Sequence, residues 1–420
     1  MSRPYGLLGR HLGHTYAPIV HREFAGIEFV KFEREPEELE GFLRGDEWEG
    51  LNVTIPYKRE AARICDELTP LAQRLGNVNT ITRTEDGRLL GDNTDYTGLV
   101  TMATTLGIDL VGIKAVVFGG TGGAGATVID MLEHLGAKPV CISRTGPDNY
   151  GNLERHADAR LAVNCTPVGM YPDCPASPCS LSSFPRLQGF MDVIYNPART
   201  ELFMEAERMN IPRASGMLMF VAQAAVTDEI FTGEAVSLLK VFNTMARLTA
   251  TEQNIAIICP PGSDRHGVGG TLAERLGRRY VDLDLELEEH LGMDGADLAR
   301  REGEEALRRE ETALLAEVAK QARLVITCGD GVTTREENYP LLHQNSLIVM
   351  LDRPSTTDGA ARNDAGMAGT GRPAGQDVPA RRPWADIVVD SSSGTDHVVQ
   401  DVLDALPPML EDDGSDAGSA

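Results

Sequence analysis

Short apolar runs alternate with segments of helical periodicity along most of the chain, and this alternation predicts an α/β architecture. The run Ala115 to Phe118 is apolar without alternation, which is typical of a buried parallel strand, and it ends in glycines. Apolar residues then recur at helical spacing between positions 128 and 135, and Gly136 lies where a C-terminal cap is expected. A buried strand, a glycine-rich loop and a helix are therefore predicted in succession.

Similar runs predict three α/β regions. We expect a first region over residues 1–98, completed by helices within 219–249, a second over 99–221 around the glycine loop, and a third over 254–406 after a polar joint at 251–253. Residues 355–382, rich in Gly, Ala, Arg and Pro, predict a mobile insertion, and residues 407–420 predict a disordered acidic tail. The predicted strands are Tyr5–Leu8, Glu28–Phe32, Leu51–Ile55, Val78–Thr82, Lys138–Ile142, Leu161–Asn164, Phe190–Val193, Asn254–Ile258, Leu324–Thr327, Leu347–Leu351 and Ile387–Val389, and the predicted closing helices are 219–232 and 235–249.

The glycine loop has the spacing of a dinucleotide-binding fingerprint. Gly120, Gly122 and Gly125 form G-x-G-x-x-G between the predicted strand and helix, which is the context that such a loop requires. Positions without side chains let the backbone approach a pyrophosphate, whose charge then rests on open N–H groups at the helix start. Glycines also serve tight turns, but the strand-to-helix context favours nucleotide binding.

The loop after the next predicted strand indicates which dinucleotide is bound. Ser143-Arg144-Thr145 follows the fingerprint by about twenty residues, where an NAD enzyme usually carries Asp or Glu for the ribose hydroxyls. A carboxylate would repel a 2′-phosphate, whereas Arg144 can hold it through charge-assisted hydrogen bonds. The alternative is a solvated arginine at a strand end. We therefore expect NADP as the cofactor.

The composition excludes several classes of partner. The 420 residues carry a formal net charge of −24, so nucleic acid and anionic membranes, which attract clustered positive charge, are not expected as partners. No apolar run reaches membrane-spanning length and no signal peptide is visible, so we expect a cytoplasmic protein. The seven cysteines show no metal-ligand spacing, which indicates reduced thiols and no metal site.

Polar loops at predicted strand ends in the first region suggest a site for a hydroxylated small molecule. They bring carboxamide, hydroxyl, ammonium and carboxylate groups after successive strands. Taken singly, Asn and Asp in glycine-containing turns usually cap their own backbone, and a lone lysine is a surface residue. The three motifs are Asn52-Val-Thr-Ile-Pro-Tyr-Lys58, Gly76-Asn-Val-Asn-Thr80 and Gly91-Asp-Asn-Thr-Asp95.

In their order and spacing, these motifs resemble those of shikimate dehydrogenase over residues 1 to about 248. That family reduces 3-dehydroshikimate reversibly with NADPH, a step of chorismate and aromatic amino-acid biosynthesis. The resemblance implies an α/β substrate domain beside a Rossmann-like NADP domain. It is further carried by Gly6-Leu-Leu-Gly9, Val163-Asn-Cys-Thr-Pro-Val-Gly-Met170, Met191-Asp-Val-Ile-Tyr195 and Gly216-Met-Leu-Met-Phe-Val-Ala-Gln223.

The resemblance also implies roles for individual residues. Lys58 and Asp95 match the catalytic pair, and a lysine within hydrogen-bond reach can deliver the proton that carbonyl reduction requires. The substrate contacts implied are Thr15, Thr54, Lys58, Asn79, Asp95, Tyr195 and Gln223. The cofactor contacts expected from the fingerprint and the resemblance are Gly120, Thr121, Gly122, Gly123, Ala124, Gly125, Ser143, Arg144, Thr145, Val193 and Gly216.

One departure from the family concerns the site for the substrate carboxylate. The family's His-Ser-x-Ser-Pro is here His14-Thr15-Tyr16-Ala17-Pro18, so Thr15 keeps one hydroxyl and Ala17 has none. Losing one hydrogen bond to a charged group costs roughly 1.5–3 kcal/mol. The possible functions are therefore a shikimate dehydrogenase, a dehydrogenase for quinate or a related ring carboxylate, and a non-catalytic sensor of pathway intermediates.

The C-terminal region, residues 254–406, resembles shikimate kinase but departs from it at the phosphate loop. Residues 272–284 match that family closely, whereas the expected G-x-x-x-x-G-K-[ST] reads Cys259-Pro-Pro-Gly-Ser-Asp264-Arg265-His266. Two glycines, the lysine and the magnesium-binding hydroxyl are all replaced, so we expect no kinase activity.

Several substrate-site residues of the kinase family persist in this region. Asp284, Arg308 and Gly329 match its substrate contacts, and Asp282 matches a residue associated with the metal. The region is either a structural remnant or a retained ligand pocket that serves regulation. The sequence does not indicate the oligomeric state or the physiological direction of the reaction.

Overall fold

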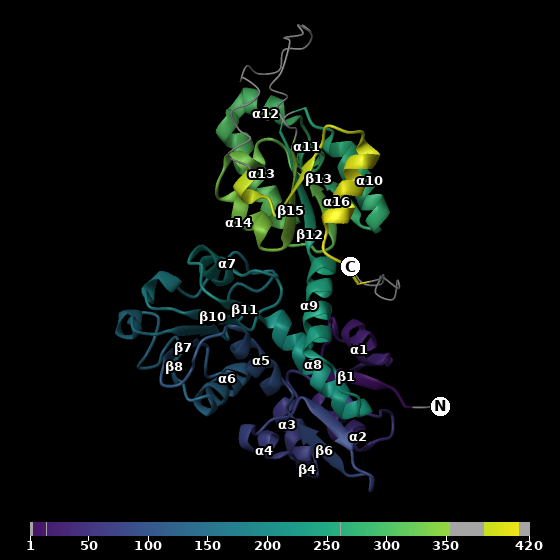
Figure 1. Cartoon of the computed structure of the whole chain (residues 1–420), viewed down its shortest axis with the longest axis vertical. Coiled ribbons are helices and arrows are strands. Elements are labelled where there is room, and N and C mark those ends of the chain that lie inside the picture. The colour runs from purple at the N-terminus through teal and green to yellow at the C-terminus, as the bar shows by residue number, and fades with distance from the viewer. Residues whose placement is uncertain (1–2, 14, 261, 353–381, 411–420) are drawn as a thin grey trace. The chain divides into compact units, whose positions relative to one another are not determined.

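The computed structural model describes residues 3–13, 15–260, 262–352 and 382–410. The chain forms two compact units: Met1–Tyr195 with Thr200–Ala246, and Asn196–Arg199 with Arg247–Ala420. The described part of the first unit contains a six-stranded and a five-stranded sheet, and that of the second contains a five-stranded sheet (Figure 1). The predicted α/β class is confirmed. The domain limits given above remain predictions.

The six-stranded sheet of the first unit has the order β2-β1-β3-β5-β6-β4, with β5 antiparallel to both of its neighbours. Its register pairs Leu8 with Val53 and Asn52 with Thr80, so the ends of β1 and β3 meet the start of β5. Its elements are β1 (Tyr5–Gly9), α1 (Ala17–Ala25), β2 (Phe29–Glu33), η1 (Pro36–Glu38), α2 (Leu39–Arg44), β3 (Leu51–Val53), α3 (Lys58–Ile64), β4 (Glu67–Leu68), α4 (Pro70–Leu75), β5 (Thr80–Arg83), β6 (Leu89–Asp92) and α5 (Asp95–Thr105).

Two strands of this sheet have no counterpart among the predictions. The short edge strand β4 and the strand β6 were not predicted, and β5 begins two residues later than expected. Gly91 weakens the strand pattern of β6, yet a Cβ there would lie 2.6 Å from Val78 Cγ1 and 2.9 Å from Leu68 Cδ2. The close packing of β6 therefore requires a glycine at position 91, and the same glycine weakens the strand pattern in the sequence.

The second sheet is fully parallel, in the order β11-β10-β9-β7-β8. Phe118 pairs with Ile142 on one side and with Asn164 on the other, so the loops after β7, β8 and β9 share one edge. Every residue of β9 and of β10 is buried, which explains their continuous apolar character. The elements are β7 (Lys114–Phe118), α6 (Gly123–His134), β8 (Lys138–Ile142), η2 (Leu153–His156), β9 (Leu161–Asn164), η3 (Leu181–Ser183), β10 (Gly189–Asp192), α7 (Glu201–Arg208) and β11 (Arg213–Ser215).

Two long helices follow, and both differ from their predicted limits. The helix α8 (Gly216–Thr232) begins three residues before the predicted start and packs against α1 and α5, so it is apolar around most of its circumference. The helix α9 (Leu238–Glu252) continues through most of the predicted polar joint. Gln253 is buried there because the guanidinium of Arg278 donates to the main-chain carbonyls of residues 250, 251 and 253.

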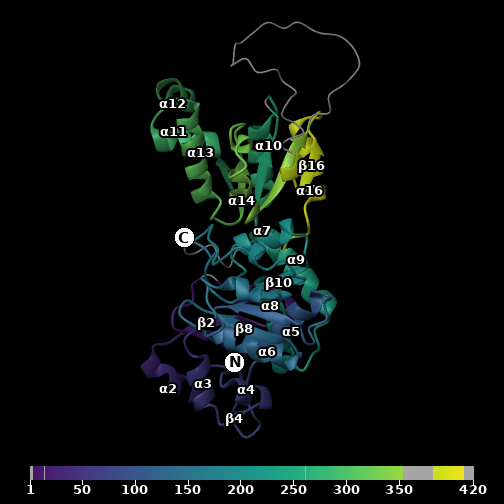
Figure 2. The same cartoon turned by 90° about the vertical axis from the view of Figure 1, so that its left-hand side faces the viewer.

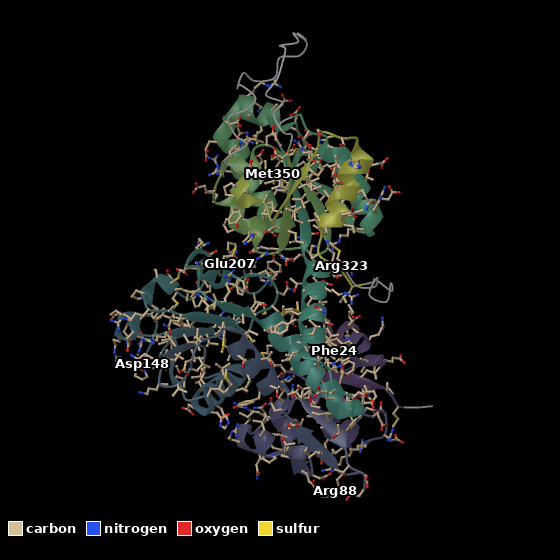
Figure 3. The ribbon with its side chains drawn as sticks, viewed as in Figure 1. Phe24, Arg88, Asp148, Glu207, Arg323 and Met350 are labelled. Atoms are coloured by element: carbon tan, nitrogen blue, oxygen red, sulfur yellow. The ribbon has the colours of Figure 1, made fainter. Side chains whose placement is uncertain are left out.

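The second unit is built on a parallel sheet of order β13-β14-β12-β15-β16 with a hydrophobic core on each face. Helices α10 and α16 lie on one side of the sheet and α13 and α14 on the other, as Figures 1 and 2 show. Met350, fully buried, lies among the strands (Figure 3). The elements are β12 (Asn254–Ile258), α10 (Arg265–Leu276), β13 (Arg279–Asp282), α11 (Leu283–Leu291), α12 (Gly295–Glu302), α13 (Glu304–Val318), β14 (Leu324–Thr327), η4 (Val332–Thr334), α14 (Asn338–His343), β15 (Ser346–Asp352), η5 (Arg382–Trp384), β16 (Ile387–Asp390) and α16 (Thr395–Ala405).

The two segments predicted to be disordered fall largely outside the described residues. This holds for positions 355–381 of the insertion and 411–420 of the tail. Residues 407–410 are described, and they differ from the expected tail because Leu410 is buried and its N–H donates to Thr251 Oγ1 at 2.8 Å. Among the described residues, no helix combines the length and the apolar character that a bilayer crossing requires.

Candidate active site

A pocket of about 320 Å³ in the first unit collects the polar strand-end residues of the first sheet. The register described above brings these residues together, because the ends of β1 and β3 meet the start of β5 at one edge. All seven substrate contacts implied by the resemblance line it. The lining residues are Leu7, Thr15, Ala17, Asn52, Val53, Thr54, Ile55, Lys58, Asn79, Asp95, Ala124, Val193, Tyr195, Gly216, Met219, Phe220 and Gln223.

Lys58 and Asp95 form an ion pair in this pocket, with Lys58 Nζ 2.5 Å from Asp95 Oδ2. Each is the first residue of its helix, Lys58 of α3 and Asp95 of α5. A helix N-terminus favours the carboxylate of Asp95 and disfavours the ammonium of Lys58. Both side chains are partly accessible, at 29% and 17%. The pair therefore presents an ammonium group, held by a fixed carboxylate, to whatever enters the pocket.

A buried amide fixes the second oxygen of the carboxylate. Asn79 Nδ2 donates to Asp95 Oδ1 at 2.9 Å, and Asn79 Oδ1 accepts from the main-chain N–H of Thr94 at 2.7 Å. The main-chain donor sets the orientation of the amide, since a carbonyl oxygen must face it. Gln223 Oε1 lies 3.3 Å from Asn79 Nδ2, so α8 joins the same network. Asp95 is thus held from two sides.

Two aromatic side chains, Tyr195 and Phe220, also line the pocket, and Tyr16 packs against both. The rings of Tyr16, Tyr195 and Phe220 lie within 6.3 Å of one another by their centroids. Burial raises the pKa of the Tyr195 hydroxyl, so this group is a proton donor and not an anion near neutral pH. Phe220 and Met219 were not singled out as site residues, although they belong to the Gly216–Gln223 motif.

The position that lacks a hydroxyl lies on the pocket surface. Ala17 is 4% exposed and lines the pocket beside Thr15, whose hydroxyl accepts from the Ala17 N–H at 3.3 Å. One hydroxyl is therefore available at this end of the pocket where the family pattern has two. The change in sequence is a change in the chemistry of the pocket wall.

The glycine loop presents an open helix start. Gly122 is the N-cap of α6 and no side chain caps the helix, so the first N–H groups of α6 are available to an anion. A Cβ on Gly125 would lie 2.5 Å from Gly119 O, and one on Gly120 would lie 2.8 Å from Cys141 Sγ. These glycines let the loop fold tightly against the sheet. The loop fits a dinucleotide pyrophosphate.

Three of the predicted cofactor residues also line the pocket described above. These are Ala124 on α6, Val193 after β10 and Gly216 at the start of α8. Ser143, Arg144 and Thr145 follow β8 at the edge that carries the glycine loop, and Arg144 is exposed. The pocket is thus continuous with the start of the fingerprint helix, and a guanidinium group lies exposed at the same edge of the sheet.

The corresponding loop of the second unit is closed by its own side chains. Asp264 is the N-cap of α10 and accepts from the Gly267 N–H at 3.0 Å and from Thr395 Oγ1 at 2.7 Å. These two hydrogen bonds hold the pKa of the Asp264 carboxyl below its usual value. A carboxylate therefore takes the place that a phosphate oxygen occupies at an open helix start.

The cations of the second unit are also paired internally. The guanidinium of Arg265 contacts the carboxylates of Asp284 and Asp330, and that of Arg308 contacts Glu304 and Glu311. Both arginines border a pocket of about 270 Å³ that also contains Glu288 and Asp294. In the described part of the chain, no group of three or more Cys, His, Asp or Glu side chains is placed to hold a metal ion.

Comparison with known proteins agrees with this division of the chain. Residues 7–81 match the family model for the shikimate dehydrogenase substrate binding domain, and residues 261–405 match the model for shikimate kinase. A shikimate dehydrogenase (NADP(+)) from Geobacillus sp. (strain WCH70) is 31% identical over 261 residues, which cover 56% of this chain and 94% of the relative.

A bifunctional chloroplastic protein from Arabidopsis thaliana, named 3-dehydroquinate dehydratase/shikimate dehydrogenase, is 33% identical over 271 residues. The match covers 55% of this chain and 44% of that protein, so this chain spans less than half of its length. The crystal structure of Thermus thermophilus shikimate 5-dehydrogenase, in complex with NADP(H) and shikimate, superposes with a TM-score of 0.51 and 31% identity over 57% of this chain and 97% of that one. This chain belongs to the shikimate dehydrogenase family through its N-terminal unit, and a domain similar to shikimate kinase follows it.

Proposed function

We propose that the first unit is an NADP-dependent shikimate dehydrogenase, which reduces 3-dehydroshikimate reversibly to shikimate. The observation that carries the proposal is the Lys58–Asp95 ion pair in a pocket that is continuous with the start of the fingerprint helix. A proton donor and a dinucleotide site must face the same carbonyl group for such a reaction. The relatives named above include an NADP(+)-dependent shikimate dehydrogenase.

The roles of the chain's residues follow from their positions. NADPH supplies a hydride to the carbonyl carbon when it is bound. Lys58 donates a proton from Nζ to the carbonyl oxygen, so this oxygen becomes the hydroxyl group of the product and no alkoxide is left. Asp95 holds Lys58 and the nearby hydroxyl groups of the substrate, and Asn79, which also contacts Gln223, holds Asp95. Thr15 and Thr54 contribute hydroxyl groups to the pocket wall.

The cofactor contacts are proposed on the same basis. The open start of α6 holds the pyrophosphate, and Arg144 holds the 2′-phosphate of NADP through charge-assisted hydrogen bonds. No carboxylate occupies Ser143-Arg144-Thr145, and the Asp148 carboxylate further along the loop contacts Arg155 and His156. This assignment accounts for a preference for NADP over NAD.

A second substrate is favoured by one specific observation. Ala17 removes a hydroxyl group from the pocket end where the family binds the substrate carboxylate. Quinate or a related ring carboxylate is therefore a second candidate substrate for this altered pocket. Steady-state assays of the full chain with NADP⁺ or NAD⁺, each against shikimate and quinate, test both candidates. We expect turnover with NADP⁺ and shikimate. Turnover with quinate alone would replace the first candidate, and no turnover with either substrate would contradict the dehydrogenase.

We infer that the second unit does not transfer phosphate. The Asp264 carboxylate occupies the helix start that would receive a phosphate, and Arg265 is turned to two carboxylates. A coupled assay of ADP release from the full chain, with shikimate, ATP and Mg²⁺, should give the background rate. Turnover that Arg265→Ala abolishes would show an active kinase. A sensor of pathway intermediates is less favoured, because the two arginines of its pocket are already paired.

The remaining proposals concern the partners and the cellular location of the protein. The net charge of −24 supports a small-molecule enzyme that does not bind nucleic acid, because a polyanion would be repelled. The composition and the unpatterned cysteines support a cytoplasmic location.

A further inference from the structure

A buried histidine–aspartate pair contacts the pocket residue Asn52 and lies outside the residues assigned above. His21 on α1 and Asp228 on α8 are fully buried, and His21 Nδ1 lies 2.6 Å from Asp228 Oδ1. The imidazole stacks on Phe29 with ring centroids 3.8 Å apart. Replacing such a pair by apolar side chains is often neutral or stabilising. Stability alone therefore gives little reason for its presence.

The other nitrogen of His21 contacts the amide of Asn52, and the orientation of that amide can be derived. Asn52 Nδ2 lies 3.1 Å from the main-chain carbonyl oxygen of Asn79, which can only accept. Asn52 Oδ1 must therefore face His21 Nε2, at 3.0 Å. An oxygen acceptor at this distance requires that Nε2 carry a proton. A contact of 2.6 Å between His21 Nδ1 and Asp228 Oδ1 requires a proton between these two atoms as well.

A continuous series of hydrogen bonds leads from this pair to the ion pair in the pocket. Asn52 Nδ2 lies 3.3 Å from Thr80 Oγ1, Thr80 Oγ1 donates to Asn79 Oδ1 at 3.1 Å, and Asn79 Nδ2 donates to Asp95 Oδ1 at 2.9 Å. The contacts allow each member to donate toward the pocket, starting from His21 Nε2, and Thr227 Oγ1 lies 3.2 Å from both Asn52 Nδ2 and Thr80 Oγ1. We call this series, His21–Asn52–Thr80–Asn79–Asp95, the donor chain.

The elements that the pair joins are also the walls of the pocket. The helix α1 begins at Ala17, Asn52 lies just before Thr54 at the end of β3, and α8 carries Gln223. The His21–Asp228 hydrogen bond links α1 to α8, and His21 links both helices to β3. These three elements therefore meet at one buried polar point.

We propose that His21 and Asp228 are positioning residues for the dehydrogenase reaction, acting through Asn52 and the donor chain on Asp95 and Lys58. The proposal rests on the proposed function of the first unit. Small displacements of reacting groups reduce turnover more than binding. Loss of the Nε2–H donor should therefore lower kcat about tenfold and change the KM for NADP⁺ less than about twofold.

Two substitutions at one position separate the two bonds of the histidine. In His21→Gln the amide nitrogen can reach the place of Nε2 and donate to Asn52, while the bond to Asp228 is lost. In His21→Asn the amide nitrogen can reach the place of Nδ1 and donate to Asp228, while the bond to Asn52 is lost. We expect His21→Gln to keep kcat within about threefold of the parent and His21→Asn to lose about tenfold. Equal or reversed values, corrected for the folded fraction, would overturn the proposal.

Two further measurements keep the test independent of folding and of the reaction itself. His156→Asn alters another buried histidine, at the end of η2 and 3.0 Å from Asp148 Oδ1, and should lower thermal stability but not kcat at saturating cofactor. Nitrogen NMR of the parent, with the His21 signal assigned by its loss in His21→Asn, should show a proton on Nε2. Absence of that proton would refute the donor chain even in a protein without dehydrogenase activity, whereas failure of the proposed function alone would leave the proton in place.

Discussion

The loop after β7 in the first unit and the loop after β12 in the second have the same local topology, but the first leads to a helix start that is open to an anion and the second to one that a carboxylate caps. Both follow a buried parallel strand and lead into a twelve-residue helix. Gly122 leaves the start of α6 uncapped, whereas the Asp264 carboxylate caps α10. The fold provides a helix start in either case, and the N-cap residue determines whether it is open to a phosphate.

The cations near the two loops differ in the same way. Arg144 is exposed beside the open loop, whereas Arg265 is 16% exposed and paired with carboxylates beside the closed one. A guanidinium that is already paired offers less to an incoming anion, because its hydrogen bonds and its charge are in use. Retention of the fold therefore does not imply retention of phosphate chemistry.

The largest expected effect is a loss of dehydrogenase turnover in the first unit. Lys58→Ala should lower kcat for shikimate oxidation by roughly 10²- to 10⁴-fold, the range for loss of a general acid or base, and should leave the Kd for NADP⁺ nearly unchanged. Arg265→Ala, the corresponding loss of a cation in the second unit, should leave the dehydrogenase rate at the parental value. Near-parental turnover in Lys58→Ala would remove Lys58 from the mechanism.

The next substitution gives the open loop the cap of the closed one. Gly122 has φ −77° and ψ 173°, and a Cβ there would lie 3.6 Å from Gly119 O, so Gly122→Asp fits the backbone. A carboxylate about 4 Å from a phosphate costs about 4 kcal/mol at an effective dielectric constant of about 20. NADP⁺ affinity should therefore fall by at least about a hundredfold.

The stability of the same variant provides its internal check. An aspartate at the N-cap stabilises a helix by only about a few tenths of a kcal/mol relative to glycine, so Gly122→Asp should unfold at an equal or slightly higher temperature than the parent. Gly122→Ala is the uncharged control and should change NADP⁺ affinity by less than about threefold. An unaltered affinity in Gly122→Asp would mean that the pyrophosphate does not rest on the start of α6.

A smaller effect is expected at the exposed guanidinium. Arg144→Ala should weaken NADP⁺ binding by roughly ten- to a hundredfold, corresponding to the roughly 1.5–3 kcal/mol of a hydrogen bond to a charged group, and NAD⁺ binding should change little. Calorimetric titration of both cofactors measures the two values. Equal losses, or a parent that prefers NAD⁺, would contradict the proposed 2′-phosphate contact.

The smallest effect is expected at the end of the pocket that holds the carboxylate. Ala17→Ser restores a hydroxyl group on the pocket wall and should lower the KM for shikimate by about tenfold, the lower end of the roughly 1.5–3 kcal/mol of a hydrogen bond to a charged group. Ala17→Val adds bulk without a hydroxyl and serves as the control. An unchanged or higher KM for shikimate in Ala17→Ser would show that the missing donor does not limit binding.

Only part of the structure of the closed loop could be predicted from the sequence. Asp264 was recognised as the replacement of a glycine in the phosphate loop, and its hydrogen bonds with Gly267 and Thr395 are consistent with the predicted loss of kinase activity. The internal partner of Arg265 could not be predicted, because Asp284 and Asp330 reach it only through the folding of α11 and the loop after β14. A motif shows which groups are present, and the fold determines which are already paired.

The residues in and around the pocket of the first unit were also predictable only in part. Lys58, Asp95 and Asn79 were singled out because their motifs resemble those of the family, and the register of β3, β5 and β6 brings them together. His21 and Asp228 are separated by 207 positions and carry no local pattern that links them. Contacts between distant helices depend on packing, which periodicity does not encode.

The comparison of the two loops is tested most directly by equilibrium titration of the full chain with NADP⁺ and, separately, with MgATP. The account predicts saturable binding of NADP⁺ that Gly122→Asp weakens by at least about a hundredfold, and no saturable binding of MgATP in the parent. Saturable MgATP binding that Arg265→Ala abolishes, or NADP⁺ binding that is unaffected by Gly122→Asp, would contradict it.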